Sequence, residues 1–371
     1  MKYCKKCILP DTRPNLLIGS DGICNACKNH DKKPNINWNS RAQDFKKLVE
    51  HVVKTSDSYD CLIPVSGGKD STWQTKVCLD HGLTPLAVTW ATPARTEIGQ
   101  KNLENLISLG VDHIDYRINP KVEKTFMWKA FQLHGSTALP MHMAIFSIPQ
   151  NIAVKFKIPL IIYGENSAFE YGDTQNATQG FEMNAEWLKK FGVTAGTGPE
   201  DWLQHGFRKK ELAGYKRPTA QTLNEHNIRA IFLGQYFRWD PEDVKNFANK
   251  IGFQFQDGKR KTGLYDYADI DDDFISVHHW MKWYKFGFTR LFDNLSLEIR
   301  NQRITREDAI NKVIELGDQT PYEDIEKCCE FMEVNTEQFY KVAEKFRNHA
   351  IWTKQGDKWL IKDFIIKNWE W

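Results

Sequence analysis

Short apolar runs alternate with amphipathic stretches over the first two thirds of the chain. Five runs are candidates for buried strands, namely 59–65, 83–90, 110–118, 158–164 and 228–234. Helical periodicity separates them, most clearly over 97–109 and 122–133. Strands and helices that alternate in this way predict an α/β fold in which a parallel sheet is covered by helices on both faces.

The pattern changes from Pro241 onward, where helical segments replace the alternation. The expected helices are 241–250, 274–286, 305–316, 321–332 and 336–349. Residues 40–54, ahead of the first strand, also have helical periodicity, with Ser40 as the candidate N-cap. We therefore expect three units: an N-terminal module over 1–38, the α/β domain over 39–238 and a helical C-terminal domain over 239–371.

Residues 165–220 have no clean period and contain many polar and aromatic groups. Because a long irregular insertion in a compact domain is usually functional or mobile, we interpret this segment as a substrate lid. Its basic residues are candidates for clamping the phosphates of a nucleotide or nucleotide-sugar, and a solvated basic surface is the alternative. They are Lys209, Lys210, Lys216 and Arg217.

Composition narrows the function classes. The 371 residues are 41% hydrophobic and 26% charged, as in globular proteins, and no apolar run reaches the length of a membrane span. The polar N-terminus does not resemble a signal peptide, so we expect a cytoplasmic protein. With 50 Lys and Arg against 48 Asp and Glu, a chain-wide attraction to nucleic acid is not indicated, although a local basic patch stays open.

A glycine-rich turn follows the first predicted strand and opens a helix. Its residues are Ser66, Gly67, Gly68, Lys69, Asp70 and Ser71. The two glycines can adopt positive φ and have no Cβ, so backbone N–H groups can close around a phosphate at the positive end of the helix. Lys69 adds a charge, and the serines add hydroxyl donors. The spacing differs from that of a Walker A loop, and an ordinary βα turn is the alternative interpretation.

The carboxyl ends of parallel strands meet at one edge of a sheet, so residues that follow other strands should join this turn. Trp90 would flank adenine, with core packing as an equally weighted alternative. Gly164 would allow close backbone approach. Glu165 could serve magnesium or substrate, with a solvated loop acid as the alternative. Asp70 either positions the loop or magnesium, or is a first-turn carboxylate favoured by the helix dipole.

Four of the eight cysteines form two Cys-x-x-Cys pairs near the N-terminus: Cys4, Cys7, Cys24 and Cys27. This spacing is typical of a Cys4 zinc site, in which each pair aims two thiolates at one tetrahedral ion. Disulfides are the alternative, and the expected cytoplasmic location disfavours them. Four protein ligands leave no open position, so we expect structural Zn²⁺ that contributes folding energy.

The glycine turn resembles the PP-loop of ATP pyrophosphatases, which use a HUP-like sheet. Together with the N-terminal cysteines, the chain resembles the N-acetyl sugar amidotransferases of bacterial surface-polysaccharide and nonulosonic-acid biosynthesis, including the O-antigen of lipopolysaccharide and pseudaminic acid. Four strings carry the resemblance, namely 1–14, 163–166, 214–217 and 293–300.

The resemblance implies a ligase that uses ATP and Mg²⁺ to turn an acetamido group of an N-acetyl sugar into an acetamidino group. The loop would hold the β,γ-pyrophosphate while the α-phosphate activates the acetamido oxygen. No Cys-His-Glu glutaminase segment is visible in the sequence, and the resemblance implies separate glutaminase subunits, similar to the amidotransferase pair of histidine biosynthesis, as the source of ammonia.

Two other functions stay open at this point. A PP-loop enzyme that thiolates tRNA would also combine cysteine pairs with this loop, but only Cys61 and Cys78 lie near the loop, without a Cys-x-x-Cys pair. The third possibility is a non-catalytic zinc-ribbon adaptor that keeps a nucleotide fold as a scaffold. The intact loop argues against it.

Overall fold

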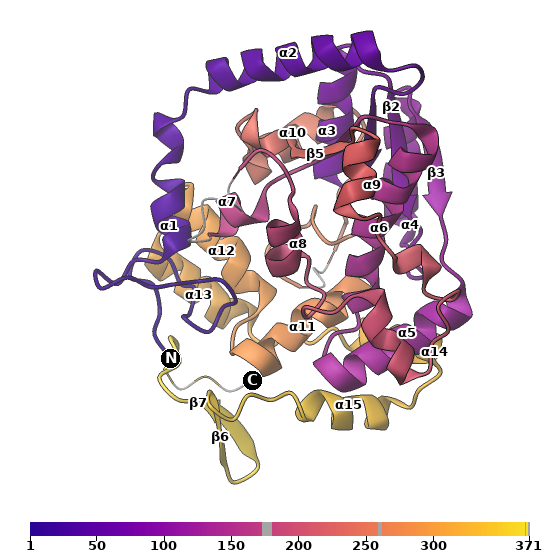
Figure 1. The fold of residues 1–371 in the computed structure, drawn as a ribbon. Coiled ribbons are helices and arrows are strands. Elements are labelled where there is room, and N and C mark those ends of the chain that lie inside the picture. The colour runs from indigo at the N-terminus through magenta and orange to yellow at the C-terminus, as the bar shows by residue number, and fades with distance from the viewer. Residues whose placement is uncertain (173–179, 259–261, 368, 370–371) are drawn as a thin grey trace.

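The computed structural model describes residues 1–172, 180–258, 262–367 and 369 (Figure 1). Residues 173–179 of the predicted lid lie outside the described part. The architecture is a parallel sheet enclosed by helices, with further helices from the C-terminal third beside it and a small hairpin at the bottom of the view, away from the sheet (Figure 1). Among the helices of the described residues, none combines the length and the apolar character that crossing a bilayer requires.

The sheet contains five parallel strands in the order β3-β2-β1-β4-β5. They are β1 (Cys61–Pro64), β2 (Pro85–Trp90), β3 (Asp112–Tyr116), β4 (Leu160–Tyr163) and β5 (Arg229–Phe232). Each strand lies inside one of the predicted apolar runs. Because the chain moves outward from β1 to β3 and then returns to β4, the strand order reverses between β1 and β4, which is where such sheets bind ligands.

Successive residues of β1 point to opposite faces of the sheet and join two different cores. Ile63 packs with α2 (Trp38–Thr55), α3 (Lys69–Asp80) and α4 (Glu97–Ser108), whereas Leu62 packs with α5 (Pro120–His134) and α6 (Leu139–Phe156). The predicted coverage of both faces by helices is therefore confirmed.

Two sequence expectations in this domain need correction. The N-cap of α2 is Asn37, whose side chain accepts a hydrogen bond from the N–H of Ser40, so Ser40 is not the cap itself. Helix α6 was not predicted from the sequence. It is almost uniformly apolar, buries residues all along its length and contains Pro149, so it lacks the amphipathic period that identifies a surface helix.

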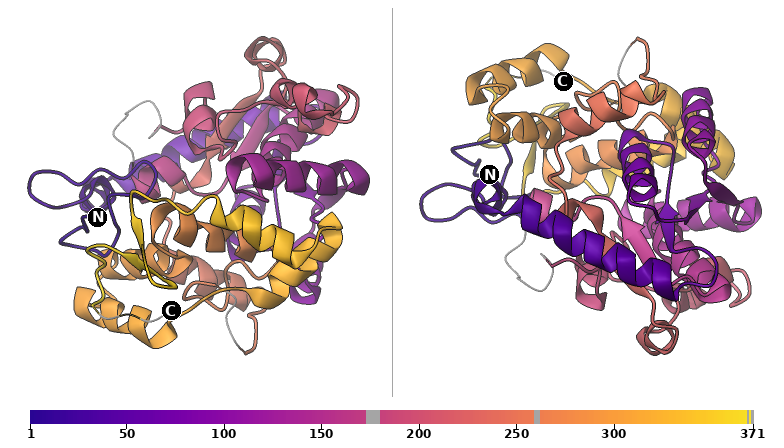
Figure 2. Two further views of the ribbon diagram at one scale, coloured as in Figure 1. Left: turned by 90° about the horizontal axis from the view of Figure 1, so that it is seen from below. Right: turned by 90° about the horizontal axis from the view of Figure 1, so that it is seen from above.

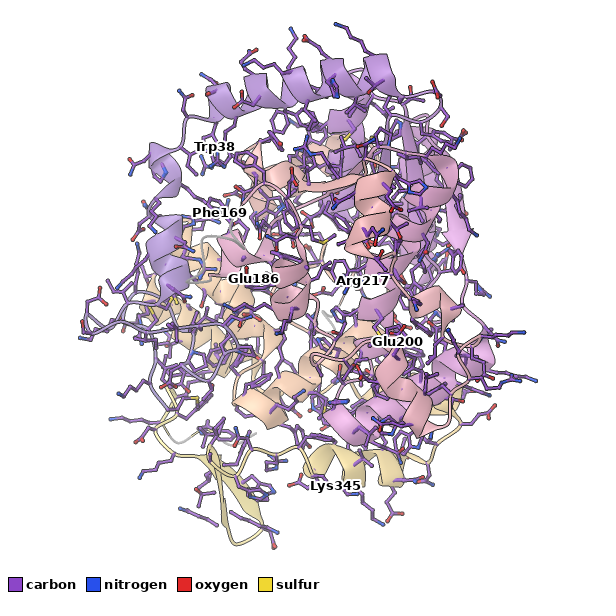
Figure 3. The ribbon with its side chains drawn as sticks, viewed as in Figure 1. Trp38, Phe169, Glu186, Glu200, Arg217 and Lys345 are labelled. Atoms are coloured by element: carbon purple, nitrogen blue, oxygen red, sulfur yellow. The ribbon has the colours of Figure 1, made fainter. Side chains whose placement is uncertain are left out.

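The described part of the predicted lid consists of short elements. They are α7 (Ser167–Tyr171), α8 (Ala185–Phe191), 3-10 helices at Pro199–His205 and Ala213–Tyr215, and the start of α9 (Ala220–Glu225). Figure 3 shows residues of this segment, among them Phe169, Glu186, Glu200 and Arg217, spread across one face of the molecule. The lack of a sequence period agrees with these short turns.

The C-terminal third contains five helices among its described residues. They are α11 (Phe274–Phe286), α12 (Arg290–Arg300), α13 (Arg306–Leu316), α14 (Tyr322–Met332) and α15 (Thr336–Glu344), after α10 (Pro241–Lys250). A hairpin of β6 (Trp352–Gln355) and β7 (Lys358–Ile361) follows, and the last predicted helix ends at Glu344 rather than 349. Neither α12 nor the hairpin was predicted. Asp293, Asn294 and Ser296 are weak helix formers in the middle of α12, and tertiary burial holds them there.

The N-terminal module has no separate core. The four cysteines and Ile8 share one buried cluster with α12, α13 and residues 351–369. Short elements α1 (Asn25–His30) and a 3-10 turn at Lys33–Asn35 connect the module to α2. Arg306 donates a hydrogen bond to the carbonyl of Cys7 at 3.1 Å. Figure 2 shows the N-terminal segment beside the C-terminal helices in both views, so the two ends of the described chain form one body.

Candidate functional site

The glycine loop is a tight connection between β1 and α3. Gly67 has φ +87°, and a Cβ there would meet the backbone nitrogen of Leu103 at 2.6 Å. The Ser66 hydroxyl accepts a hydrogen bond from the N–H of Gly68 at 3.3 Å, and the Ser71 hydroxyl donates to the Gly68 carbonyl at 3.0 Å. The loop therefore presents the start of α3, with its first-turn N–H groups and positive dipole end, without side-chain obstruction.

A cavity of about 500 Å³, which we call the loop pocket, opens over this turn. On one side it is lined by the loop and by residues beyond the carboxyl ends of β2 and β4, namely Ser66, Gly68, Lys69, Asp70, Trp90, Thr92 and Glu165. On the other side it is lined by the C-terminal third, including Trp239, Tyr265, Tyr267, Asp269, Asp271, Asp272, Arg290 and Asn294. The site is thus shared between the sheet and the helical third.

Lys69 and Asp70 interact directly at the N-terminal end of α3. The Lys69 ammonium lies 2.5 Å from one carboxylate oxygen of Asp70, and the indole N–H of Trp239 donates to the other oxygen at 2.8 Å. The ammonium also lies 5.5 Å from the ring of Trp239 and 5.8 Å from that of Tyr267. Because Lys69 is only 5% exposed, its charge is held inside the site.

Acidic groups gather around the same cavity. Burial, followed by repulsion from the Asp70 carboxylate, raises the pKa of Glu165 to about 7. Burial also raises the pKa of Asp271, although a hydrogen bond from the Ser66 hydroxyl opposes this shift. Carboxylates that destabilise one another's charge in a cavity fit a divalent cation, which prefers oxygen ligands. Asp70, Glu165 and Asp271 are the residues that could hold Mg²⁺.

Trp90 ends β2 and Gly164 directly follows β4, and of these two residues Trp90 lines the loop pocket whereas Gly164 does not. The indole N–H of Trp90 donates to the Glu123 carboxyl at 3.1 Å while the ring lines the cavity, so packing and ligand contact are compatible. Burial raises the pKa of Glu123 to about 8. The carbonyl of Gly164 accepts a hydrogen bond from the N–H of Gly234 at 3.0 Å, which fixes the turn that carries Glu165.

The second wall of the loop pocket was missed by the sequence reasoning. It comes mainly from residues 265–272, an irregular segment between α10 and α11 that contains two tyrosines and several aspartates. Aromatic and acidic residues that are concentrated between two helices are a signal that could have identified this segment. Nothing in the local pattern, however, indicates that it faces the glycine loop.

The basic residues predicted to clamp phosphates do not line the loop pocket. Lys209 and Lys210 are exposed, and Lys216 forms an ion pair with Glu200 at 2.8 Å. Arg217 is exposed beside α6. Two other lysines of the same segment, Lys189 and Lys190 at the end of α8, line a different cavity that is described below. The segment therefore provides cations, but from other positions.

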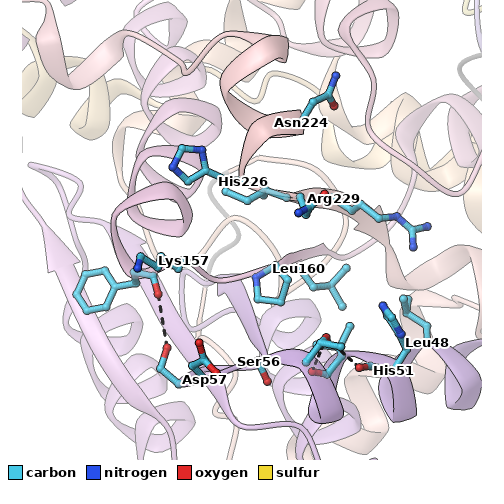
Figure 4. A pocket seen from close by; sticks show the side chains of 16 residues that line it. Leu48, His51, Ser56, Asp57, Lys157, Leu160, Asn224, His226 and Arg229 are labelled. Carbon is cyan, nitrogen blue, oxygen red and sulfur yellow. Dashed lines mark hydrogen bonds between the residues drawn. The ribbon is translucent and has the colours of Figure 1, made fainter.

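A more voluminous cavity lies elsewhere. It measures about 890 Å³ and is lined by residues at the amino ends of β1, β4 and β5, including His51, Asp57, Lys157, His226 and Arg229 (Figure 4). Parallel sheets bind ligands beyond the carboxyl ends of their strands, and this cavity is at the opposite edge. We therefore place the candidate active site at the smaller loop pocket.

The four N-terminal cysteines converge as predicted. Their sulfur atoms all lie within 4.8 Å of one another, with 3.8 Å between Cys7 and Cys24 and 4.0 Å between Cys4 and Cys27. A tetrahedron of thiolates at the usual Zn–S distance has edges of about 3.8 Å. Backbone N–H groups of Cys7, Cys24 and Cys27 also point at the sulfur atoms. The cluster fits one structural zinc ion.

The strand order, the glycine loop and the pocket above it define an α/β protein whose loop resembles a PP-loop, with an N-terminal Cys4 cluster and a helical C-terminal region. Residues 254–365 match the family described as "LPS biosynthesis protein WbpG-like, C-terminal domain". The resemblance to a surface-polysaccharide family is confirmed for this part of the chain. No curated protein matches the chain.

Three of the solved structures that are similar to this chain have the following sequence identities, TM-scores and coverage. The NMN synthetase of Francisella tularensis is 14% identical, with a TM-score of 0.28 over 52% of this chain and 93% of that one. The NH3-dependent NAD synthetase of Campylobacter jejuni is 12% identical, with a TM-score of 0.31 over 55% and 99%. A predicted tRNA methyltransferase subunit of Methanocaldococcus jannaschii is 11% identical, with a TM-score of 0.30 over 64% and 90%. These values assign no activity.

Proposed function

We propose that the protein is the synthetase subunit of an ATP-dependent amidotransferase of bacterial surface-polysaccharide biosynthesis. It converts the acetamido group of an N-acetyl sugar into an acetamidino group, with AMP and pyrophosphate as the other products. The observation that carries the proposal is the loop pocket, in which a glycine loop suited to phosphate faces side chains of the WbpG-like segment. Phosphate chemistry and the family-specific region thus meet in one cavity.

The reaction divides into two steps because an amide carbonyl is a poor electrophile. First, the acetamido oxygen attacks the α-phosphorus of ATP, and the bond to the β-phosphate breaks with release of pyrophosphate. Second, ammonia attacks the activated carbon, the C–O bond breaks and AMP leaves with its electron pair. Loss of a proton from the attacking nitrogen completes the amidine, which is cationic at neutral pH.

Each step has residues suited to it. The Gly67–Gly68 backbone and the start of α3 would bind the β- and γ-phosphates, and the ammonium of Lys69 would neutralise the departing pyrophosphate. Asp70 and Glu165 would hold Mg²⁺, which supplies charge stabilisation to the phosphates when bound. Trp90 at the end of β2 would contact the adenine.

Ammonia would come from separate glutaminase subunits, as the family resemblance implies. The cysteines of the described chain support this division: four form the N-terminal cluster, and Cys61, Cys78, Cys328 and Cys329 are buried. A buried thiol in apolar surroundings is not a glutaminase nucleophile. A protein that depends on ATP and on thiolate ligands for zinc would act in the cytoplasm.

The test is a pyrophosphate-release assay with ATP, Mg²⁺ and ammonium, and with UDP- or CMP-linked N-acetyl sugars or bulk tRNA as acceptors. We expect release with one class of sugar, together with a product lighter by about one mass unit because NH replaces O. Release with tRNA alone would support the thiolation-type enzyme instead. No release and no ATP binding with any acceptor would support the adaptor.

The assay has a matched control within α3. Lys69→Met should abolish most turnover, whereas Lys76→Met removes a lysine that pairs with Asp80 on the exposed side of the same helix. Equal loss in both variants would contradict a role for Lys69 at the phosphates.

A further inference from the structure

A second cavity, which we call the basic pocket, lies beside the loop pocket. It measures about 580 Å³ and is lined by residues of the N-terminal module, α5, α6, α8, α11 and α12. Figure 1 shows α8 on the same side of the molecule as α11. Its charged lining consists of Arg13, Lys189, Lys190, Lys282, Lys285, Arg290 and Asp293. Six cationic side chains therefore line a cavity whose lining includes one carboxylate, and one of the six, Arg290, also pairs with Asp269 outside this lining at 3.0 Å.

The carboxylate of Asp293 already forms ion pairs with two of these cations. Asp293 is 2% exposed, and its two oxygens lie 2.8 Å from Arg13 and 2.9 Å from Lys282. Although burial by itself raises the pKa of Asp293, the charges of Lys282 and Arg13 hold it well below its ordinary value. The ion pairs tie the N-terminal module to α11 and α12 and leave no further acid in the lining.

Lys285 is the cation whose surroundings most clearly need an anion. Its ammonium donates a hydrogen bond to the carbonyl of His134 at 3.0 Å, and no carboxylate of the described residues forms an ion pair with it. Burial lowers the pKa of Lys285, because desolvation disfavours its charge. The ammonium is partly buried and lies 5.6 Å from the ring of Phe286, and an anionic ligand in the pocket would supply the counter-ion that the lining does not.

Aromatic rings lie in the same lining. Phe191 follows the two lysines at the end of α8, and Phe286 and Phe288 follow Lys285 at the end of α11. Cations next to aromatic faces match a nucleotide, whose phosphates need positive charge and whose base stacks on rings. A carboxylated sugar would use the charge but not the rings.

The two pockets adjoin each other along the same helices. Arg290 lines both. On α11, Ile275 lines the loop pocket and Lys282 lines the basic pocket, and seven residues of helix separate them by about 10 Å. On α6, Met141 lines the loop pocket and Leu139 lines the basic pocket. The two cavities therefore share a wall, and a ligand longer than the basic pocket would extend along it toward the loop pocket.

We propose that the basic pocket binds the phosphates of a nucleotide-linked N-acetyl sugar, whose sugar extends along α11 toward the loop pocket. This inference rests on the proposed function, since it identifies the nucleotide-bearing form of the acceptor as the substrate. The acetamido group would then face the α-phosphate of ATP at Arg290, while the nucleotide stays among the lysines of α8 and α11.

Binding without turnover tests the pocket separately from the reaction. The zinc-loaded full-length protein is titrated in a calorimeter with UDP, CMP, UDP-N-acetylglucosamine, N-acetylneuraminic acid and free N-acetylglucosamine, in the absence of ATP. We expect at least one nucleotide probe to bind and Lys285→Met to weaken it by tenfold or more, since a charge-assisted hydrogen bond is lost. Lys189→Met should weaken it about tenfold, and it keeps the test valid if Lys285→Met fails to fold, because Lys189 is exposed.

Two controls separate the outcomes. Lys46→Met, on the exposed side of α2, should leave the affinity for the nucleotide probe unchanged. Lys69→Met should also leave this affinity unchanged, but it should weaken the binding of ATP. Binding of UDP or CMP that depends on Lys69 but not on Lys285 would overturn the proposal, as would binding of N-acetylneuraminic acid alone. If nucleotide binding depends on Lys285 but no acceptor yields pyrophosphate, the proposed reaction fails while the pocket assignment stands.

Discussion

The cysteine cluster and the glycine loop are both short motifs, and they differ in what surrounds them. All four thiols are fully buried and enclosed by the side chains of α12 and α13. The glycine loop instead opens onto a cavity that the helical third completes. From this difference we expect the cysteine cluster to stabilise the fold and the glycine loop to stay accessible to a ligand. Substitutions in the cluster should therefore lower mainly stability, and substitutions in the loop should also lower ligand binding or turnover.

Removal of zinc should have the largest effect. Structural zinc in small modules contributes about 10 kcal/mol or more, and the module here shares its core with the helices that line the loop pocket. We expect a strong chelator, or Cys24→Ser, to lower the thermal unfolding temperature and to abolish ATP binding together. Calorimetry with and without re-added zinc measures this. An unchanged unfolding temperature would show that the cluster is not a structural metal site.

Gly67→Ala should combine damage to the fold with damage to the ligand site. The variant places a Cβ 2.6 Å from the Leu103 backbone at φ +87°. Gly82→Ala is its matched control, because Gly82 has φ +83° but nothing within 4 Å of the added carbon. We expect about 1 kcal/mol of destabilisation in the control and roughly 1–3 kcal/mol more in Gly67→Ala, by urea unfolding. Equal effects would contradict close packing of the loop.

Lys69→Met should affect turnover much more than stability. Loss of a preorganised charge at the departing pyrophosphate is expected to reduce kcat by about 100-fold or more. The unfolding temperature should stay close to that of the unmodified protein, which contrasts with the chelated protein. Initial rates of pyrophosphate release, measured beside thermal melts, provide both quantities. A Lys69→Met variant with a lower unfolding temperature but a normal kcat would contradict this prediction.

The pH dependence of stability should show the smallest effect. The pKa of Glu165 is raised to about 7, so the folded state holds a proton that the unfolded state releases near pH 4.5. Stability therefore falls as the pH rises from about 4.5 to 7. Glu165→Gln should flatten the profile, and Mg²⁺ should do so in the unmodified protein. Glu50→Gln, on the exposed side of α2, is the control that should leave the profile unchanged.

The sheet, the loop and the cysteine cluster could be predicted because their signals are local. Apolar runs located the five strands of the parallel sheet, and residues that follow β1, β2 and β4 line one cavity. The two cysteine pairs were sufficient to bring four sulfur atoms together. Each of these features depends on residue types a few positions apart, which the sequence displays directly.

The second wall of the loop pocket could not be predicted, because it depends on contacts between distant segments. Tyr267 and Asp271 lie far from the glycine loop in sequence and reach it only through the packing of α10 and α11. For the same reason, the sequence could not show which lysines of the predicted lid line a cavity. Composition indicated cations in this segment, but only the position of α8 over α11 selects Lys189 and Lys190 for a cavity.

The shared core of residues 1–30 and 351–369 has a consequence for how the chain is made. The ribosome synthesises the cysteine pairs long before the aromatic residues that cover them, so this hydrophobic surface stays uncovered until the later segment has been made. Early capture of the metal would hold the nascent segment together during that interval. Chaperone demand during expression should therefore increase when cellular zinc is scarce.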